Sequence, residues 1–207
     1  QSESEVQWPQ AMALALEAYP LRYDVVVVDE GQDFGDPHWF ALEDIWQHAS
    51  KRYVFYDPNQ SIFRRAQAYP VGTERTLMLT KSCRNTRAIH EVAYRFYQGP
   101  PEVDPPSILG HPVVRWEESS IKAQAARLAR EVGNFIQKER VAPEDIAVLV
   151  LSSKGKQIAY DAAEAAFKGG PTLAKQSHGQ QGLVLLDTVK RFKGLEASVV
   201  VLWAHEQ

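Results

Sequence analysis

An α/β fold with mainly parallel sheets and flanking helices is the fold class that this sequence predicts. Short apolar, β-branched runs alternate along the chain with stretches of helical period, which is typical of strand–helix–strand units. The run Val25–Val28 is too short for a helix and ends directly at Asp29 and Glu30. We expect it to be a central parallel strand with both faces covered.

The spacing of apolar residues, together with the proline and glycine residues that interrupt it, predicts the remaining helices and strands. The expected helices span residues 9–19, 37–49, 86–97, 120–140 and 157–167. The expected strands span residues 25–28, 53–56, 76–79, 113–116, 145–151, 183–188 and 198–203. Ser119 or Ser120 is expected to cap the fourth helix. The proline-rich stretch over 99–112 is expected to be an extended surface connection.

Composition excludes several classes of function. The 207 residues include 23 basic and 26 acidic side chains, a net charge of −3, which argues against a protein that coats nucleic acid through charge alone. Cys83 is the only cysteine, so no intrachain disulfide can form and a reducing compartment is expected. Without a long apolar run or a signal segment, we expect a soluble, cytoplasmic protein with no membrane partner. Two domains are expected, with the boundary near residue 80.

The carboxyl end of the valine strand is the first candidate site. Ligands bind at this edge of open α/β sheets. Asp29 is therefore placed to hold a hydrated magnesium ion, and Glu30 to orient a water molecule. Gln32 and Asp33 complete the segment DEGQDF. The plainer interpretation is a strand end whose acids are only solvated.

Polar residues follow the next strand in YDPNQSIF, residues 56–63. Gln60 offers both a donor and an acceptor, which suits a phosphate oxygen or an attacking water. An aromatic ring such as that of Phe63 can stack on a base. A simple turn at Asp57 is the plainer interpretation of this segment.

Two later segments carry cationic residues near strand ends. Arg84 lies in LTKSCRNTRAIHEVA, residues 79–93, and a guanidinium can clamp the oxygens of a phosphoryl group. LLDTVKRFKGLEASVVVL, residues 185–202, contains Thr188, Lys190 and Glu196 between two strands. Its basic residues can reach phosphates, which positions a nucleic acid without specifying sequence. The plainer interpretation of Arg84 is an ion pair at the surface. For the basic residues of the second segment it is a solvated turn.

In this order, the four segments resemble motifs II to V of UvrD/Rep-type superfamily 1 DNA helicases, from Tyr23 to Trp203. The resemblance implies a RecA-like P-loop NTPase architecture, with part of a first lobe over residues 1–80 and most of a second over 81–207. It implies ATP and Mg²⁺ as cofactors and single-stranded or partly duplex DNA as partner. In the parent protein, ATP hydrolysis would drive movement along single-stranded DNA.

The resemblance also implies roles for individual residues. Three residues would be catalytic. Glu30 would activate the attacking water, and Gln60 and Arg84 would contact the γ-phosphate of ATP. Asp29 would bind magnesium, and the nucleotide would be contacted by Gln32, Arg84 and Glu196. The DNA contacts would be Phe63, Arg65, Thr188 and Lys190.

Some positions depart from the family pattern. Tyr56 stands where a glycine is usual, Arg65 where many members have a base-stacking tryptophan, Lys190 where a histidine is common, and Ala197 where an aromatic residue is common. An arginine plane can also stack on a base, so the DNA contact at Arg65 is weakened as an expectation and not removed.

The phosphate-binding loop G-x-x-x-x-G-K-[ST] does not occur in the sequence. Because the family carries it upstream, and a further arginine motif downstream, the chain is expected to be a fragment with negligible ATP turnover of its own. One alternative is a binding or scaffolding module that keeps a helicase-like architecture without enzymatic activity. Another is a metal-dependent phosphohydrolase built on Asp29, Glu30, Asp33 and Asp57.

Overall fold

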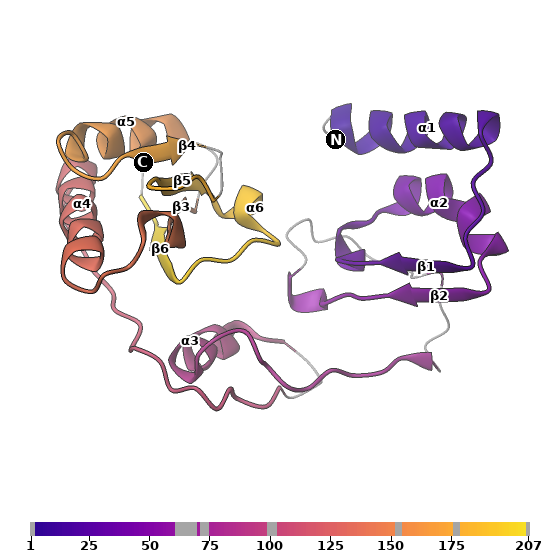
Figure 1. Cartoon of the computed structure of the whole chain (residues 1–207), viewed down its shortest axis with the longest axis horizontal. Helices are drawn as coiled ribbons and strands as arrows, with labels where there is room; N and C mark the ends of the chain where they lie inside the picture. The colour runs from indigo at the N-terminus through magenta and orange to yellow at the C-terminus, as the bar shows by residue number, and fades with distance from the viewer. Residues whose placement is uncertain are drawn as a thin grey trace. The chain divides into compact units, whose positions relative to one another are not determined.

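The computed structural model describes residues 3–60, 70, 75–98, 103–151, 155–175 and 179–205. The chain divides into two compact units, Gln1–Val113 and Val114–Gln207. Each contains its own small, all-parallel sheet flanked by helices, so the predicted α/β class is confirmed (Figure 1). None of the helices in the described ranges is long and apolar enough to cross a membrane.

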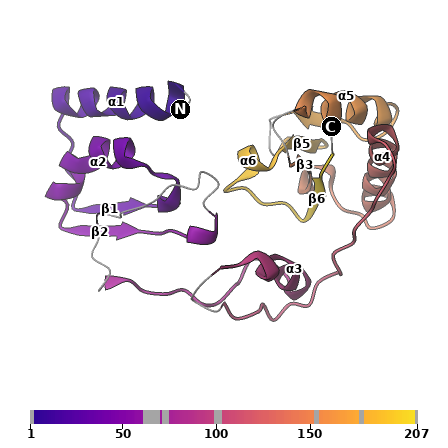
Figure 2. The ribbon, with the colours of Figure 1, turned by 180° about the vertical axis from the view of Figure 1, so that it is seen from behind.

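The first unit is built on one strand–helix–strand crossover. Strand β1 (Val25–Val28) pairs in parallel with β2 (Lys51–Val54), and helix α2 (Asp36–His48) connects them. Helix α1 (Glu3–Ala18) packs on α2, which lies between α1 and the sheet in both views (Figures 1 and 2). The two predicted strands and the helix between them form, but β2 begins and ends two residues earlier than expected and α1 also begins earlier.

Local signals explain where α2 begins. Pro37 occupies its first turn, where a missing N–H is tolerated. The backbone N–H of Gly35 donates to His38 Nδ1 over 3.2 Å, which satisfies a donor at the helix entrance. Ala41, Ile45 and Trp46 form the buried face of the helix, at helical spacing.

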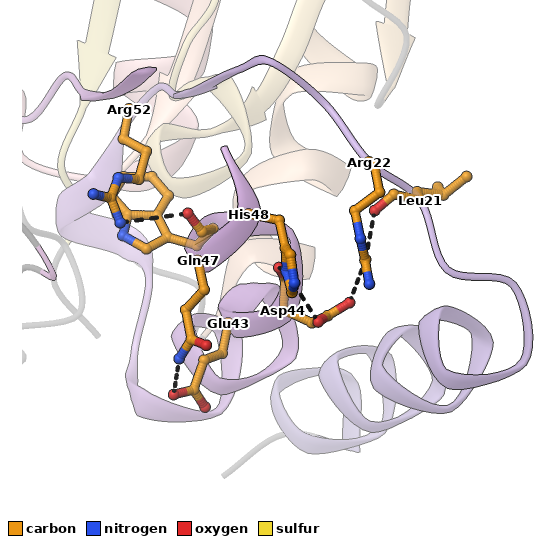
Figure 3. A network of polar contacts seen from close by, with 8 residues as sticks. Leu21, Arg22, Glu43, Asp44, Gln47, His48 and Arg52 are labelled. Carbon is orange, nitrogen blue, oxygen red and sulfur yellow. Dashed lines mark hydrogen bonds and ion pairs between the residues drawn. The ribbon is translucent and has the colours of Figure 1, made fainter. Parts of the chain in front are cut away.

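A polar network covers the exposed side of α2 (Figure 3). Arg22 Nη1 donates to Asp44 Oδ2 over 2.6 Å, and His48 lies one helical turn from that aspartate. The Arg52 guanidinium lies 5.8 Å from the centre of the Trp46 ring. Because Arg22 and Asp44 are about half exposed, their ion pair fastens the loop before β1 without adding much stability.

The expectation that β1 is covered on both faces is wrong. Val28 is 5% exposed on the face toward α2, but Val25 and Val27 are 48% and 57% exposed. Val27 pairs with Tyr53 of β2, which is 50% exposed on the same open face. The reason is that, within the described residues, the sheet has two strands and its helices lie on one side only.

The rest of this unit has little regular structure. Helix α3 (Arg87–Ala93) continues into the 3₁₀ helix η4 (Tyr94–Phe96), so the helix expected over 86–97 forms with a tighter last turn. The strand expected over 76–79 does not form; the nearest pairing is an isolated bridge between Lys81 and Asp104. Residues 105–112 have no helix or strand, as expected for the proline-rich connection.

The second unit contains a four-stranded parallel sheet in the order β4-β5-β3-β6. Its elements are α4 (Ile121–Gln137), β3 (Ile146–Val150), α5 (Lys156–Ala166), β4 (Leu173–Lys175), β5 (Val184–Thr188), α6 (Val189–Phe192) and β6 (Val199–Trp203). All the expected elements form except the strand over 113–116, which has no regular structure. The short β4 and α6 were not predicted. Ser120 caps α4 as expected, accepting from the Ala123 N–H over 3.2 Å.

The central strand of this sheet, β3, is buried along its whole length. Its side chains alternate between two cores, because successive residues of a strand point to opposite faces. Ile146, Val148 and Val150 face the main core under α4 and α5, whereas Ala147 and Leu149 face a smaller cluster under α6. The two-sided cover expected for the valine run is found here instead.

We predict that Leu186→Ala lowers the free energy of unfolding of the second unit by about 2–5 kcal/mol, because it leaves a cavity in the main core. Leu186 is fully buried, with 0% exposure. The same substitution at Leu202, which is 62% exposed on β6, should cost less than about 1 kcal/mol. Urea denaturation measures both values, and equal losses at the two positions would contradict this packing.

Candidate functional site

The chain turns sharply where β1 ends. Glu30 has φ 53° and ψ 39°, the left-handed region that a non-glycine residue adopts only when its surroundings hold it there. Asp29 supports this turn, since its Oδ1 accepts the Glu30 N–H over 2.9 Å. The turn leads into the 3₁₀ helix η1 (Gly31–Asp33). Both predicted acids therefore lie at the carboxyl edge of the sheet.

Gly31 brings this turn against the end of β2. Its N–H donates to the Phe55 carbonyl over 2.8 Å. A Cβ atom at this position would lie 2.5 Å from Val54 Cγ1, closer than real side chains approach. The glycine of the DEGQD segment is thus explained by close packing between the two strand ends.

Gln32 joins the two strand ends through its buried side-chain amide. The side chain is 1% exposed. Its Nε2 donates to Glu30 Oε2 over 2.6 Å, and its Oε1 accepts the backbone N–H of Asp57 over 3.0 Å. An amide suits this position because it supplies one donor and one acceptor at once.

Asp57 continues the network into the turn that follows β2. Its Oδ1 accepts the Asn59 N–H over 2.8 Å, and its Oδ2 accepts from Gln60 Nε2 over 2.9 Å. These bonds hold the 3₁₀ helix η2 (Pro58–Gln60). Three of the predicted site residues, Glu30, Gln32 and Gln60, therefore belong to one hydrogen-bonded network with Asp57.

Asp29 fits the predicted magnesium site because it lies at the end of a strand and because its Oδ2 atom is available. It is exposed, and within the described ranges no hydrogen bond or ion pair engages Oδ2. Magnesium usually keeps several waters and takes one or two protein carboxylates together with phosphate oxygens. A single available carboxylate at a strand end fits that requirement.

Within the described ranges, the acids of the predicted site do not gather into one metal-binding group. Across the residues that the structure describes, no three histidine, cysteine, aspartate or glutamate side chains gather as a metal-binding group. Asp29, Glu30, Asp33 and Asp57 belong to the described ranges. The phosphohydrolase alternative stays a prediction, because magnesium can bind with one or two protein carboxylates.

The other predicted residues of the first unit lie apart in the chain. Arg84 is exposed, on a bend three residues before α3 begins. That it reaches the same nucleotide as Glu30 stays a prediction. Phe63 and Arg65 lie outside the described residues, so their contact with DNA also stays a prediction.

In the second unit, the predicted residues lie at the end of β5 and in the segment that follows it. Thr188 is the last residue of the strand and is 6% exposed, whereas Lys190 on α6 and Glu196 after it are exposed. Asp187 lies beside them and was not predicted as a site residue. Its Oδ2 lies 3.3 Å from Arg191 Nε.

Asp187 is a buried carboxylate, 5% exposed, next to a buried tyrosine of α5. Burial raises the pKa of the Tyr160 hydroxyl, and the negative charge of Asp187 raises it further. The sequence carried a signal for Asp187, because it follows an apolar run at a strand end just as Asp29 does. Asp57 was recognised as a strand-end acid, but its central place in the network was not predicted.

We predict that Gln32→Glu speeds amide hydrogen exchange at Asp57 by about tenfold or more, because two carboxylates would then face each other in a buried place. The matched control is Gln47→Glu, since Gln47 Nε2 makes the same kind of bond to Glu43 over 2.9 Å on an exposed helix surface. That control should leave exchange at Asp57 unchanged. Equal exchange in wild type and Gln32→Glu would show that the amide does not hold the two strand ends.

The raised pKa of Tyr160 predicts a pH effect on stability. A tyrosine in the unfolded chain loses its proton near pH 10, while the folded state retains it, so stability is complete below about pH 10 and falls as the pH rises further. Tyr160→Phe should reduce this alkaline loss, measured by urea denaturation at pH 8 and pH 11. Tyr53→Phe, at a half-exposed position of the first unit, is the control. An unchanged alkaline loss in Tyr160→Phe would contradict the assignment.

No protein-family model matches this chain, and no curated protein matches it either.

Proposed function

We propose that this chain is part of an ATP-dependent DNA helicase or translocase of the UvrD/Rep type, with RecA-like lobes. The observation that carries the proposal is the network Glu30–Gln32–Asp57–Gln60, which links the ends of two neighbouring parallel strands. These are the residues for which the sequence resemblance implies water activation and phosphate sensing. Their joint position at the ligand-binding edge of the sheet supports those roles.

Each residue of the network has a chemical task in this proposal. The Glu30 carboxylate accepts a proton from the attacking water. Gln60 senses the γ-phosphate, and Arg84 neutralises charge on the transferred group. Asp29 holds magnesium, which neutralises charge on the phosphate oxygens when it is bound. Gln32 and Glu196 complete the nucleotide contacts.

The Gln32 amide connects the proposed water-activating residue, Glu30, to the turn that carries the proposed phosphate sensor, Gln60. It binds the carboxylate of Glu30 on one side and the backbone of Asp57 on the other, and Asp57 binds Gln60. Gln60 and Glu30 are therefore connected through Asp57 and Gln32, and we propose that movement of Gln60 toward a phosphate is transmitted to Glu30 along these bonds. A motor needs such a link, because its hydrolytic carboxylate must respond to the state of the terminal phosphate.

DNA contact is assigned to two regions. Phe63 and Arg65 would stack on bases, and Thr188 with Lys190 would approach the backbone of the strand. The exposed position of Lys190 supports a phosphate contact. Thr188 is buried, so its contact would come through a small movement of α6 or through its main chain.

The second candidate is a non-enzymatic nucleotide- or nucleic-acid-binding module. The absence of G-x-x-x-x-G-K-[ST] from the sequence favours it, because that loop supplies the amides and the lysine that hold a triphosphate. Under the first proposal, the loop is supplied by sequence outside these residues. An upstream coding sequence with that loop favours the motor, and a native start near residue 1 favours the module.

We predict that the protein carrying this chain together with an upstream phosphate loop has DNA-stimulated ATPase activity, while residues 1–207 alone turn over negligible ATP. Glu30→Gln should lower the stimulated rate by about 10²-fold or more, because the base is lost while the side-chain shape remains. Glu43→Gln, an exposed position on α2, should keep the wild-type rate. A steady-state ATPase assay with single-stranded DNA measures the longer protein, residues 1–207 alone and the two variants. Undiminished activity in Glu30→Gln would reject the helicase assignment.

A further inference from the structure

Three aromatic rings form a continuous stack on α3 and η4. The ring centres of His90 and Tyr94 are 5.0 Å apart with an interplanar angle of 20°, and those of Tyr94 and Tyr97 are 5.1 Å apart with an angle of 13°. His90 and Tyr94 lie one helical turn apart, and Tyr97 follows η4 directly in an extended conformation. His90 ends the stack, and no further ring of the described residues covers its other face.

An open pocket of about 970 Å³ lies beside this stack. One wall is the side of α3 and η4 that carries His90 and Tyr94, and the other wall is the segment over 103–105. The Tyr94 hydroxyl accepts the Val103 N–H over 3.3 Å, and Arg87 Nε donates to the Pro106 carbonyl over 3.2 Å. These bonds hold the proline-rich segment against the helix, so both walls are positioned by the fold.

The charges around the pocket are nearly balanced. Arg87 and Arg95 line it together with Glu91 and Asp104. Nε of Arg87 is already bonded to a carbonyl, but Arg95 makes no hydrogen bond or ion pair among the residues described. Charge alone would therefore not hold a polyanion here. The arrangement favours a ligand that binds mainly through a planar ring and offers an anionic group to one guanidinium.

The far end of the stack is attached to the turn that holds Gln60. The Asn59 side chain makes two bonds to the main chain of Gln98, accepting over 2.8 Å and donating over 3.3 Å. Burial raises the pKa of the neighbouring Tyr97, and the Asp57 charge raises it further. A ligand on the stack is thereby connected to the Asp57–Gln60 turn.

We propose that this stack and pocket bind unpaired bases of a nucleic-acid strand, with one base stacked on His90 and a neighbouring phosphate paired with Arg95. The inference extends the proposed function by adding a strand contact that is separate from Phe63, Arg65, Thr188 and Lys190. A continuous strand is favoured over a free nucleotide because the pocket is open, so a strand can run through it. Through Tyr97 and Asn59, an occupied pocket would stabilise one position of the η2 turn.

The test is direct binding by the 207-residue chain, without ATP. Fluorescence anisotropy is measured with a labelled oligothymidylate of about 12 nucleotides and with an abasic strand of equal length, which keeps the phosphates but offers no ring. We expect His90→Ala and Arg95→Ala each to weaken binding of the oligothymidylate by about five- to tenfold. His90→Phe should keep most of the affinity, because the stacking surface remains.

Arg115→Ala is the matched control for charge, since Arg115 is exposed in a segment without regular structure and the variant has the same net charge as Arg95→Ala. It should bind as wild type does. The abasic strand should bind more weakly than oligothymidylate to wild type and equally to wild type and His90→Ala. Thymidine monophosphate in excess should compete poorly, whereas effective competition would identify a free nucleotide as the ligand and overturn the strand assignment.

The outcomes separate this inference from the proposed function. If oligothymidylate binds but only Lys190→Ala weakens it, the strand lies elsewhere and the inference is wrong while the helicase assignment stands. If His90→Ala and Arg95→Ala weaken binding but Glu30→Gln leaves ATPase activity unchanged, the strand site stands and the helicase assignment fails. Absence of any binding to the strand overturns the inference. Unchanged circular dichroism spectra of the variants would show that the losses do not come from unfolding.

Discussion

The buried amide of Gln32 is the contact on which the candidate site depends. Its side chain bonds to Glu30 after one strand and to Asp57 after the other, and its low exposure means that a lost bond could not be replaced by water. The left-handed turn at Glu30 and the close approach at Gly31 become understandable from this contact. Both bring the segment after β1 near enough to β2 for one amide to span the gap.

The parallel strands of the two sheets are buried to different extents. In the second unit, helices lie on both faces of the sheet, and β3 is buried throughout. In the first unit, α2 covers one face, and the other exposes Val25, Val27 and Tyr53. Parallel sheets are normally covered on both sides, so this open apolar face of the described residues departs from the usual arrangement. The polar edge of the same sheet, by contrast, has a well-connected hydrogen-bond network.

Most of the fold was predictable from local pattern, and the failures have physical causes. The valine runs, the capping serine before α4 and the helical periods are local signals, and the elements they predicted form. The strands expected over 76–79 and 113–116 do not form, because a short apolar run becomes a strand only when a neighbouring strand pairs with it. The three-residue β4 was missed for the opposite reason, since it exists by pairing with β5.

The sequence by itself determined the chemistry available at each strand end, because residue types and their order along the chain are local information. It placed Asp29, Glu30, Gln32 and Gln60 as candidates and indicated an α/β fold. Only the tertiary structure decided that the Gln32 amide joins Glu30 to Asp57, and that His90, Tyr94 and Tyr97 stack beside a pocket. Such contacts depend on strand register and on the packing of distant segments, which no local pattern specifies.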